Sequence, residues 1–245
     1  ILRCLVGSEM CIRDSGGISQ LAKARNVNVL CGKASFINNS EVVVETSEKK
    51  EQIQFKNCII ASGSTAAMLP NLPLDHPLVL TSKTALDLDD VPGSLLIIGG
   101  GIIGLELGQV YSTLGTDVSV VEYMPSLIPG ADDDIAKPLI RKLKKHFKSI
   151  MLSSKVTNVD VRSGDRVRVS IESNNEIKDQ VYDKVLVSVG RKPNTNLLSL
   201  ENTDVKIDSK GFIIVDDYQK TSVKGIYAIG DIAGNPMLAH KATHE

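Results

Sequence analysis

The sequence lacks two features that would place it in a membrane-embedded or nucleic-acid-binding class. Its longest apolar segments, Leu95–Ile98 and Cys58–Ala61, have the length of a strand, whereas a membrane-spanning helix needs about 18 apolar residues. The net charge is -1, which gives no strong field to attract DNA or anionic lipid. We therefore expect a soluble protein with no nucleic-acid partner and no membrane partner.

Closely spaced cysteines are also absent. Cys4, Cys11, Cys31 and Cys58 form no CxxC pair and no zinc-type spacing. Cys31 and Cys58 lie in apolar, strand-like segments, so we expect each to be a small buried core residue without a redox role. No residue pattern predicts a metal site.

The first residues do not fit the pattern of the rest. Residues 1–15 show neither a helical nor a strand period, and they lack the apolar core of a signal peptide. We expect residues 1–15 to be a non-native segment left by cloning or sequence assembly.

A strand–helix–strand unit contains the strongest motif. Residues 94–98 predict a buried parallel strand, residues 102–114 a helix that ends at Gly115, and residues 117–122 a second strand. The turn between the first strand and the helix, residues 99–104, matches GxGxxG. Alone that pattern is weak, but here it follows an apolar strand, opens a helix and precedes an acid at the end of the next strand. The unit therefore predicts a dinucleotide-binding site.

Each residue type in this motif has a physical reason. Gly99 permits the tight turn, Gly101 allows close approach of the pyrophosphate, and Gly104 lets the helix pack near the strand. The helix N-terminus offers unpaired N–H groups and a partial positive charge to the phosphates. The carboxylate of Glu122 can accept from both ribose hydroxyls and would repel a 2′-phosphate, which favours NAD over NADP. The alternatives are a glycine turn without a ligand and, for Glu122, a surface carboxylate.

Including this motif, five segments in the same order resemble the pyridine nucleotide-disulfide oxidoreductases. They are residues 60–64, 99–108, 187–194, 227–231 and 237–242, and the last is most similar to the dihydrolipoyl dehydrogenase type. The resemblance covers residues 16–245. It implies an α/β fold class with two interleaved Rossmann-like dinucleotide-binding domains. The NAD domain, 93–194, is expected to be inserted into an incomplete FAD portion formed by 16–92 and 195–245.

The resemblance implies an NAD site larger than the glycine turn. Glu106 resembles the family's glutamate on the nicotinamide side, Ile103 implies an apolar pocket, and residues 188–191 resemble a loop that closes over NAD. Glu106 and Arg191 could instead be ordinary surface charges. The implied NAD contacts are Gly99, Gly100, Gly101, Ile102, Ile103, Gly104, Glu106, Glu122, Val156, Ser188, Val189, Gly190 and Arg191.

A second set of positions resembles the FAD site of the family. Asp231 resembles the acid that binds the ribityl chain, with a helix N-cap as its alternative role, and residues 237–240 resemble a helix start that faces the flavin pyrimidine edge. His240 itself is not expected to act as an acid or base. The implied FAD contacts are Ala34, Ser62, Gly63, Ser64, Asp231, Met237, Leu238, Ala239 and His240.

Departures from the family are equally informative. The family's FAD-binding GxGxxG, its CxxxxC redox disulfide and its His-Glu acid–base pair do not occur here, so no catalytic residue is predicted. The reaction implied for the complete protein is oxidation of dihydrolipoamide through the disulfide and FAD, with hydride passing to NAD⁺. We expect this chain to supply only the last step and not to turn over dihydrolipoamide alone.

Implied partners are a second subunit, in a homodimer, and the lipoyl domains of a 2-oxo acid dehydrogenase complex. The implied location is the bacterial cytoplasm or, in a eukaryote, the mitochondrial matrix.

Three alternatives stay open. The chain could come from another flavin disulfide reductase, such as a mercuric reductase-like protein. It could be a non-catalytic NADH-binding module that folds completely without flavin. A single-domain NAD dehydrogenase has less support, because no substrate-side acid or base stands out.

Overall fold

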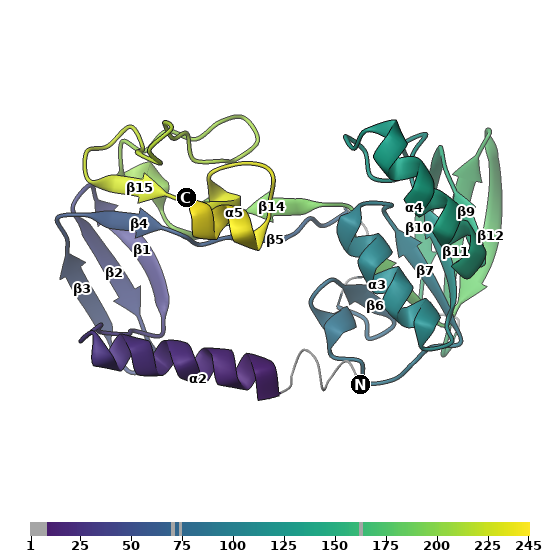
Figure 1. Ribbon diagram of the computed structural model, residues 1–245, viewed down its shortest axis with the longest axis horizontal. Coiled ribbons are helices and arrows are strands. Elements are labelled where there is room, and N and C mark those ends of the chain that lie inside the picture. Colours follow the sequence, from purple (N-terminus) through teal and green to yellow (C-terminus); the bar gives the residue numbers. More distant parts are fainter. Residues whose placement is uncertain (1–8, 70–71, 74, 162–163) are drawn as a thin grey trace. The chain divides into compact units, whose positions relative to one another are not determined.

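The computed structural model describes residues 9–69, 72–73, 75–161 and 164–245 (Figure 1). The chain separates into two compact units. Residues Ala66–Gly190 form what we call the central unit, and residues Gly17–Thr65 together with Arg191–Glu245 form the flanking unit. The central unit contains residues 93–190 of the predicted NAD domain, 93–194, and residues 79–81 add a strand to its sheet. The predicted domain bounds stay a prediction.

A five-stranded parallel sheet is the middle layer of the central unit. Its strand order is β6 (Val79–Thr81), β13 (Lys184–Val187), β7 (Ser94–Ile98), β8 (Asp117–Val121) and β9 (Ser149–Met151), and all neighbours run parallel. Most side chains of β7, β8 and β13 are buried, as expected for apolar strands covered on both faces. The buried parallel strand predicted at residues 94–98 is confirmed. The short strands β6 and β9 were not predicted, because no periodic pattern marks them in the sequence.

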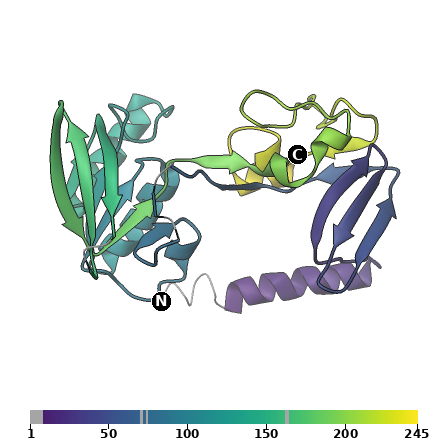
Figure 2. The same cartoon turned by 180° about the vertical axis from the view of Figure 1, so that it is seen from behind.

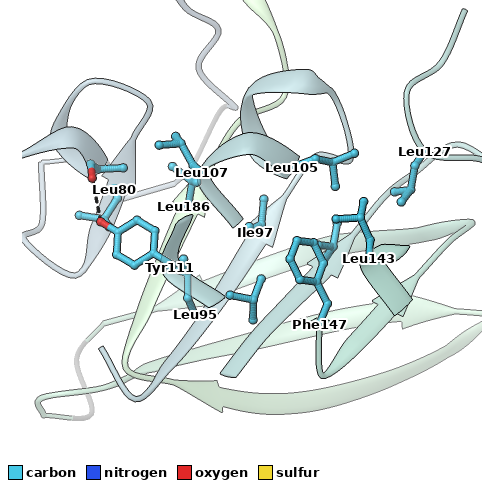
Figure 3. Close-up of a cluster of buried hydrophobic side chains, with 13 residues drawn as sticks. Leu80, Leu95, Ile97, Leu105, Leu107, Tyr111, Leu127, Leu143, Phe147 and Leu186 are labelled. Carbon is cyan, nitrogen blue, oxygen red and sulfur yellow. Dashed lines mark hydrogen bonds between the residues drawn. The ribbon is translucent and has the colours of Figure 1, made fainter. Parts of the chain in front are cut away.

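Two helices, α3 (Ile102–Thr113) and α4 (Asp133–His146), pack against one face of this sheet. Leu143 and Phe147 from the α4 region meet Leu105 from α3 and Ile97 from β7 in a buried cluster (Figure 3). The predicted helix stop is also confirmed: Gly115 follows the last residues of α3 with φ +103°, a conformation that favours glycine.

The other face of the parallel sheet is covered by an antiparallel sheet. It consists of β10 (Ser154–Asp160), β11 (Val167–Ser173) and β12 (Glu176–Tyr182). Val167, Val169 and Ile171 alternate along β11 and pack with Leu96 and Ile98 of β7. Since a helix layer and a sheet layer cover its two faces, the parallel sheet exposes only its ends and edges to ligands.

The flanking unit is built from two stretches that are far apart in the sequence, Gly17–Thr65 and Arg191–Glu245 (Figures 1 and 2). Its strands are the antiparallel set β1 (Lys33–Asn38), β2 (Glu41–Glu45) and β3 (Lys50–Gln54), the parallel pair β4 (Cys58–Ile60) and β15 (Ile226–Ala228), and the ladder of β5 (Ser64–Ala66) with β14 (Arg191–Pro193). The short helix α5 (Ala239–His244) follows near the C-terminus. The core of the flanking unit includes Phe36, Ile60, Ile213 and Ile226.

The described residues before β1 depart from the expected pattern in two places, and the non-native origin of residues 1–15 stays a prediction. Residues 1–8 of the predicted non-native segment lie outside the described residues, and residues 9–15 begin the helix α2 (Glu9–Ala24). The apolar segment around Cys31, which was expected to be strand-like, is not a strand: residues 27–31 have no regular secondary structure. Cys31 is consequently exposed and not a core residue, while Cys58 is half-buried and burial raises the pKa of its thiol.

Every helix of the described residues is too short or too polar to span a lipid bilayer. No three His, Cys, Asp or Glu side chains in the described parts of the chain are grouped to hold a metal ion.

The buried cluster in Figure 3 makes one substitution diagnostic. Leu143 on α4 is 0% exposed, so Leu143→Ala leaves a cavity beneath the helix. We expect a loss of about 2 to 5 kcal/mol in the free energy of unfolding, measured by urea denaturation. Lys142→Ala, at the neighbouring exposed position, is the control and changes stability little. Equal losses in the two variants contradict the packing of α4.

Asp183 provides a pH-dependent link between β7 and the turn before β13. Its Oδ2 accepts hydrogen bonds from the Ser94 N–H (2.7 Å) and hydroxyl (2.9 Å), and its Oδ1 accepts from the Arg166 guanidinium (2.8 Å). Burial alone raises the pKa of this carboxyl, but the bonds from Ser94 and Arg166 outweigh burial and hold the pKa below its ordinary 3.8.

A depressed folded-state pKa stabilises the fold above the unfolded-state value, and this stability is lost as the pH falls through the folded value. Thermal unfolding from pH 7 to pH 3 should therefore show a steeper loss of stability below about pH 4 in the parent chain than in Asp183→Asn. Identical pH profiles for the two chains contradict this role of Asp183.

Candidate dinucleotide-binding site

The glycine-rich turn lies between β7 and α3, at the carboxyl end of the parallel sheet. Gly99 has φ +107°, and a Cβ there would lie 2.4 Å from the carbonyl oxygen of Ser188. A Cβ at Gly104 would lie 2.5 Å from the carbonyl oxygen of Gly99. These two glycines are therefore required by the backbone and by the contact of α3 with the sheet, in agreement with the sequence argument.

Gly101 differs from its neighbours. Its φ is -79°, and a Cβ there would have no atom within 4 Å, so neither backbone conformation nor packing requires a glycine. Gly101 is the N-cap of α3, and no side chain of the described residues caps this helix. The Leu105 N–H is bonded to the Gly101 carbonyl (3.1 Å), so the N–H groups before it in the first turn face the open space beside Gly101. This arrangement suits an anionic ligand that needs close backbone approach.

Glu122 follows β8 and is held beside the same turn. It is only 7% exposed, its Oε2 accepts from the Gly100 N–H (2.6 Å), and its Oε1 accepts from the Met124 N–H (2.7 Å). Both carboxylate oxygens are thus fixed in place, and each keeps further acceptor capacity for a ribose hydroxyl. The alternative of a freely solvated surface carboxylate does not fit this burial.

Both backbone polar groups of Gly100 have hydrogen-bond partners within the protein. Its N–H donates to Glu122, its carbonyl accepts from the Ile128 N–H (2.9 Å), and a Cβ there would lie 2.4 Å from Leu127. The structure therefore gives Gly100, predicted as an NAD contact, an internal partner for its N–H. Sequence reasoning missed the contributions of Met124, Leu127 and Ile128, because an irregular loop after a strand leaves no periodic signal.

Ser188 connects the end of β13 to the glycine turn. Its hydroxyl lies 3.2 Å from the carbonyl oxygens of both Ile98 and Gly99. Gly99, Glu122 and Ser188 each follow a parallel strand, so they meet at one edge of the sheet, where open α/β folds bind ligands.

The other predicted NAD residues of the central unit differ in exposure and in the core they pack against. Ile102 is 52% exposed, Ile103 is half-buried against the helix-side core, and Glu106 is exposed one turn into α3. β10 begins beside Glu122, because the Ser154 N–H donates to the Glu122 carbonyl (3.0 Å). Val156, on β10, and Val189 are half-buried and pack against the sheet-side core, and Gly190 is exposed.

Arg191 was predicted with the NAD loop but lies in the flanking unit. Its Nε donates to the Ser64 hydroxyl (2.6 Å), and its Nη2 donates to the Ser64 carbonyl (2.6 Å). The structure thus brings Arg191 together with residues that were predicted for FAD.

The predicted FAD residues fall into three groups within the flanking unit. Ser62, Gly63, Ser64 and Asp231 lie together where β4 and β15 end, and the Ser64 hydroxyl donates to the Asp231 carboxylate (2.5 Å). Met237 and Leu238 are half-buried before α5, while Ala239 and His240 are exposed in its first turn. Ala34 is exposed on β1, in the antiparallel sheet, and pairs with Val44.

One buried polar atom in the first group has no partner. The Oγ of Ser62 is inaccessible and forms no hydrogen bond with the described residues. A buried hydroxyl without a partner is costly, so it indicates a polar ligand at this point. The residues present are therefore compatible with a hydroxyl- or phosphate-bearing group such as FAD.

The parallel sheet, the glycine turn and Glu122 define the class of protein: an α/β dinucleotide-binding protein. The chain belongs to the pyridine nucleotide-disulphide oxidoreductase family, whose sequence profile matches residues 9–245. The FAD and NAD positions predicted above stay predictions at the level of single residues.

Characterised relatives agree with this family. The chain is 44% identical over 232 residues to a dihydrolipoyl dehydrogenase from Vibrio cholerae, and the match covers 94% of this chain and 48% of the relative. A dihydrolipoyl dehydrogenase from Haemophilus influenzae is also 44% identical, with the same coverage of 94% and 48%. The chain thus spans about half the length of the curated relatives it matches.

Solved structures share the fold. The HOCl-induced flavoprotein disulfide reductase RclA from Escherichia coli superposes with a TM-score of 0.83 at 27% identity, over 94% of this chain and 51% of that one. LpdA from Mycobacterium tuberculosis gives a TM-score of 0.87 at 24% identity, over 96% of this chain and 52% of that one. The α/β fold with a parallel sheet, expected from the sequence, is confirmed.

Gly101 and Gly104 form a matched pair for testing the glycine turn. Gly101→Ala should change the free energy of unfolding by less than about 1 kcal/mol, because its Cβ meets open space, and should weaken NADH binding at least about tenfold. Gly104→Ala should destabilise the fold itself, because its Cβ meets a backbone carbonyl. Thermal unfolding and NADH fluorescence titration separate the two effects. Unchanged NADH affinity in Gly101→Ala argues against pyrophosphate binding at this turn.

Proposed function

We propose that the central unit binds NAD(H) and that the chain supplies the hydride-accepting part of a dihydrolipoyl dehydrogenase-type flavoprotein. The observation that carries the proposal is the pairing of the uncapped N-terminus of α3 with a buried, doubly bonded Glu122. The first offers N–H groups to a pyrophosphate and the second offers acceptors to a ribose. Together they select a dinucleotide without a 2′-phosphate.

The protein's own contribution is binding and orientation. The first turn of α3 and Gly101 would hold the pyrophosphate, Glu122 would fix the adenosine ribose, and Ser188 keeps the turn closed against β13. In the flanking unit, Asp231 with Ser64 would hold the ribityl hydroxyls of FAD, and the Ser62 hydroxyl would gain the partner it lacks. FAD, when bound, supplies the two-electron chemistry that delivers a hydride to NAD⁺.

The substrate and partners of the longer protein belong to the same proposal. Identity of 44% to dihydrolipoyl dehydrogenases, against 27% to a different flavoprotein disulfide reductase, favours dihydrolipoamide as the electron donor. The redox disulfide would then come from a part of the protein outside this sequence. We further propose a homodimer that serves the lipoyl domains of a 2-oxo acid dehydrogenase complex, in the cytoplasm of a bacterium or in a mitochondrial matrix.

Glu122→Gln tests the proposed choice of cofactor. Removing the charge should raise the ratio of NADPH to NADH affinity by about tenfold, because the like-charge repulsion of a 2′-phosphate disappears. Asp117→Asn, at the exposed opposite end of β8, removes the same charge and should leave the ratio unchanged. Both ratios are measured by fluorescence titration. A parent chain that prefers NADPH or binds neither nucleotide overturns the proposal.

The electron donor can be tested on the chain itself. Its four cysteines include no CxxxxC pair, so dihydrolipoamide should yield no NADH above background when the chain, FAD and NAD⁺ are mixed. Absorbance at the NADH band provides the measurement. NADH formed in proportion to chain concentration shows that another route from thiol to flavin exists.

A further inference from the structure

The carboxylate of Asp231 stands at the end of a hydrogen-bonded chain. The Ser64 hydroxyl donates to Asp231 Oδ2 (2.5 Å) and accepts from Arg191 Nε (2.6 Å). The guanidinium of Arg191 also lies 3.7 Å from the same carboxylate oxygen. The Arg191 and Asp231 side chains are 27% and 23% exposed, so the pair is partly shielded from solvent.

Arg191 is fixed by more than this one bond. Its Nη2 donates to the Ser64 carbonyl (2.6 Å), so the guanidinium forms a fork on a single residue. The hydroxyl of Ser64 has only one hydrogen, and with Arg191 filling its acceptor side that hydrogen is directed to Asp231. The order of the chain, from Arg191 through Ser64 to Asp231, is therefore determined by the donors available.

Gly230, the residue before Asp231, is held through both its N–H and its carbonyl group. The Gly230 N–H donates to Glu245 Oε2 (2.6 Å), and the Gly230 carbonyl accepts from Lys241 Nζ (3.2 Å). Lys241 and Glu245 pair with each other at 2.6 Å. Gly230 has φ +75°, and a Cβ there would lie 3.0 Å from the Ala242 Cβ, so α5 closes directly on this turn.

We propose that Arg191 and Ser64 are positioning residues of the flavin site: they orient the Asp231 carboxylate toward the ribityl hydroxyls. This inference rests on the proposed FAD site and reassigns Arg191, which the sequence placed in a loop over NAD. Two of the carboxylate's contacts come from its own unit and lie on Oδ2, which leaves Oδ1 as the acceptor for the ligand. The clamp on Gly230 keeps the backbone from rotating that oxygen away.

The two assignments of Arg191 predict opposite results for two ligands. A residue of the NAD loop affects NADH affinity, whereas a residue that positions Asp231 affects FAD affinity alone. The experiment uses the full chain and titrates it with FAD, followed by flavin fluorescence, and separately with NADH. Circular dichroism melting reports whether each variant is folded.

Four variants are compared with the parent chain. Arg191→Gln and Ser64→Ala should each weaken FAD binding about tenfold, since each removes a charge-assisted link to the carboxylate. Ser64→Thr keeps a hydroxyl and should restore most of the affinity. Lys192→Gln, the exposed neighbour of Arg191, removes the same charge and should have no effect. NADH affinity should stay unchanged in all four.

A double variant tests whether the residues act in series. Arg191→Gln combined with Ser64→Ala should bind FAD about as well as either single variant, because both interrupt the same chain. Weaker NADH binding in Arg191→Gln with unchanged FAD binding overturns the inference and restores the NAD-loop role. If neither Arg191→Gln nor Ser64→Ala changes the FAD affinity, the positioning role is overturned and the proposed flavin site is not. A parent chain that binds no FAD overturns the proposed flavin site together with it.

Discussion

The contact on which the central unit's site depends is the hydrogen bond between the Gly100 N–H and the Glu122 carboxylate. It joins the turn after β7 to the end of β8, so the glycine turn and the Glu122 carboxylate are held together by the protein itself. A carboxylate that is 7% exposed needs partners, and here two backbone N–H groups provide them. The same bond explains why residue 100 is a glycine: a side chain there would meet Leu127 and Glu122.

Around this contact, the layers of the central unit serve to keep the turn rigid. The helix α3 approaches the sheet closely only because Gly104 and Gly108 lack side chains, and Phe147 and Ile97 fill the space beside Gly108. On the other face, the antiparallel sheet begins next to Glu122, where the Ser154 N–H donates to the Glu122 carbonyl. Preorganisation of this kind reduces the ordering that a bound nucleotide would otherwise cost.

In the flanking unit, the carboxylate of Asp231 is held by side chains, whereas Glu122 is held by backbone N–H groups. Asp231 is held by side chains from distant parts of the sequence, Ser64 after β4 and Arg191 on β14. The backbone N–H and carbonyl of Gly230 are held by Glu245 and Lys241. The Ser62 hydroxyl, which is buried and has no hydrogen-bond partner in the described part of the chain, lies in the segment next to this network. An unsatisfied donor and an oriented acceptor in neighbouring segments are typical of a site that is completed by its ligand.

The sequence by itself determined the parallel strand at residues 94–98, the helix that follows, its stop at Gly115 and the presence of a dinucleotide motif, because all of these rest on local periodicity and turn chemistry. It could not show that Gly100 binds Glu122, that residues 79–81 add an edge strand, that Cys31 is exposed, or that Arg191 pairs with Ser64 and Asp231. Those outcomes depend on which segments meet across the fold. Only the tertiary structure decides them, because hydrogen-bond partners and burial are set by neighbours that are distant in sequence.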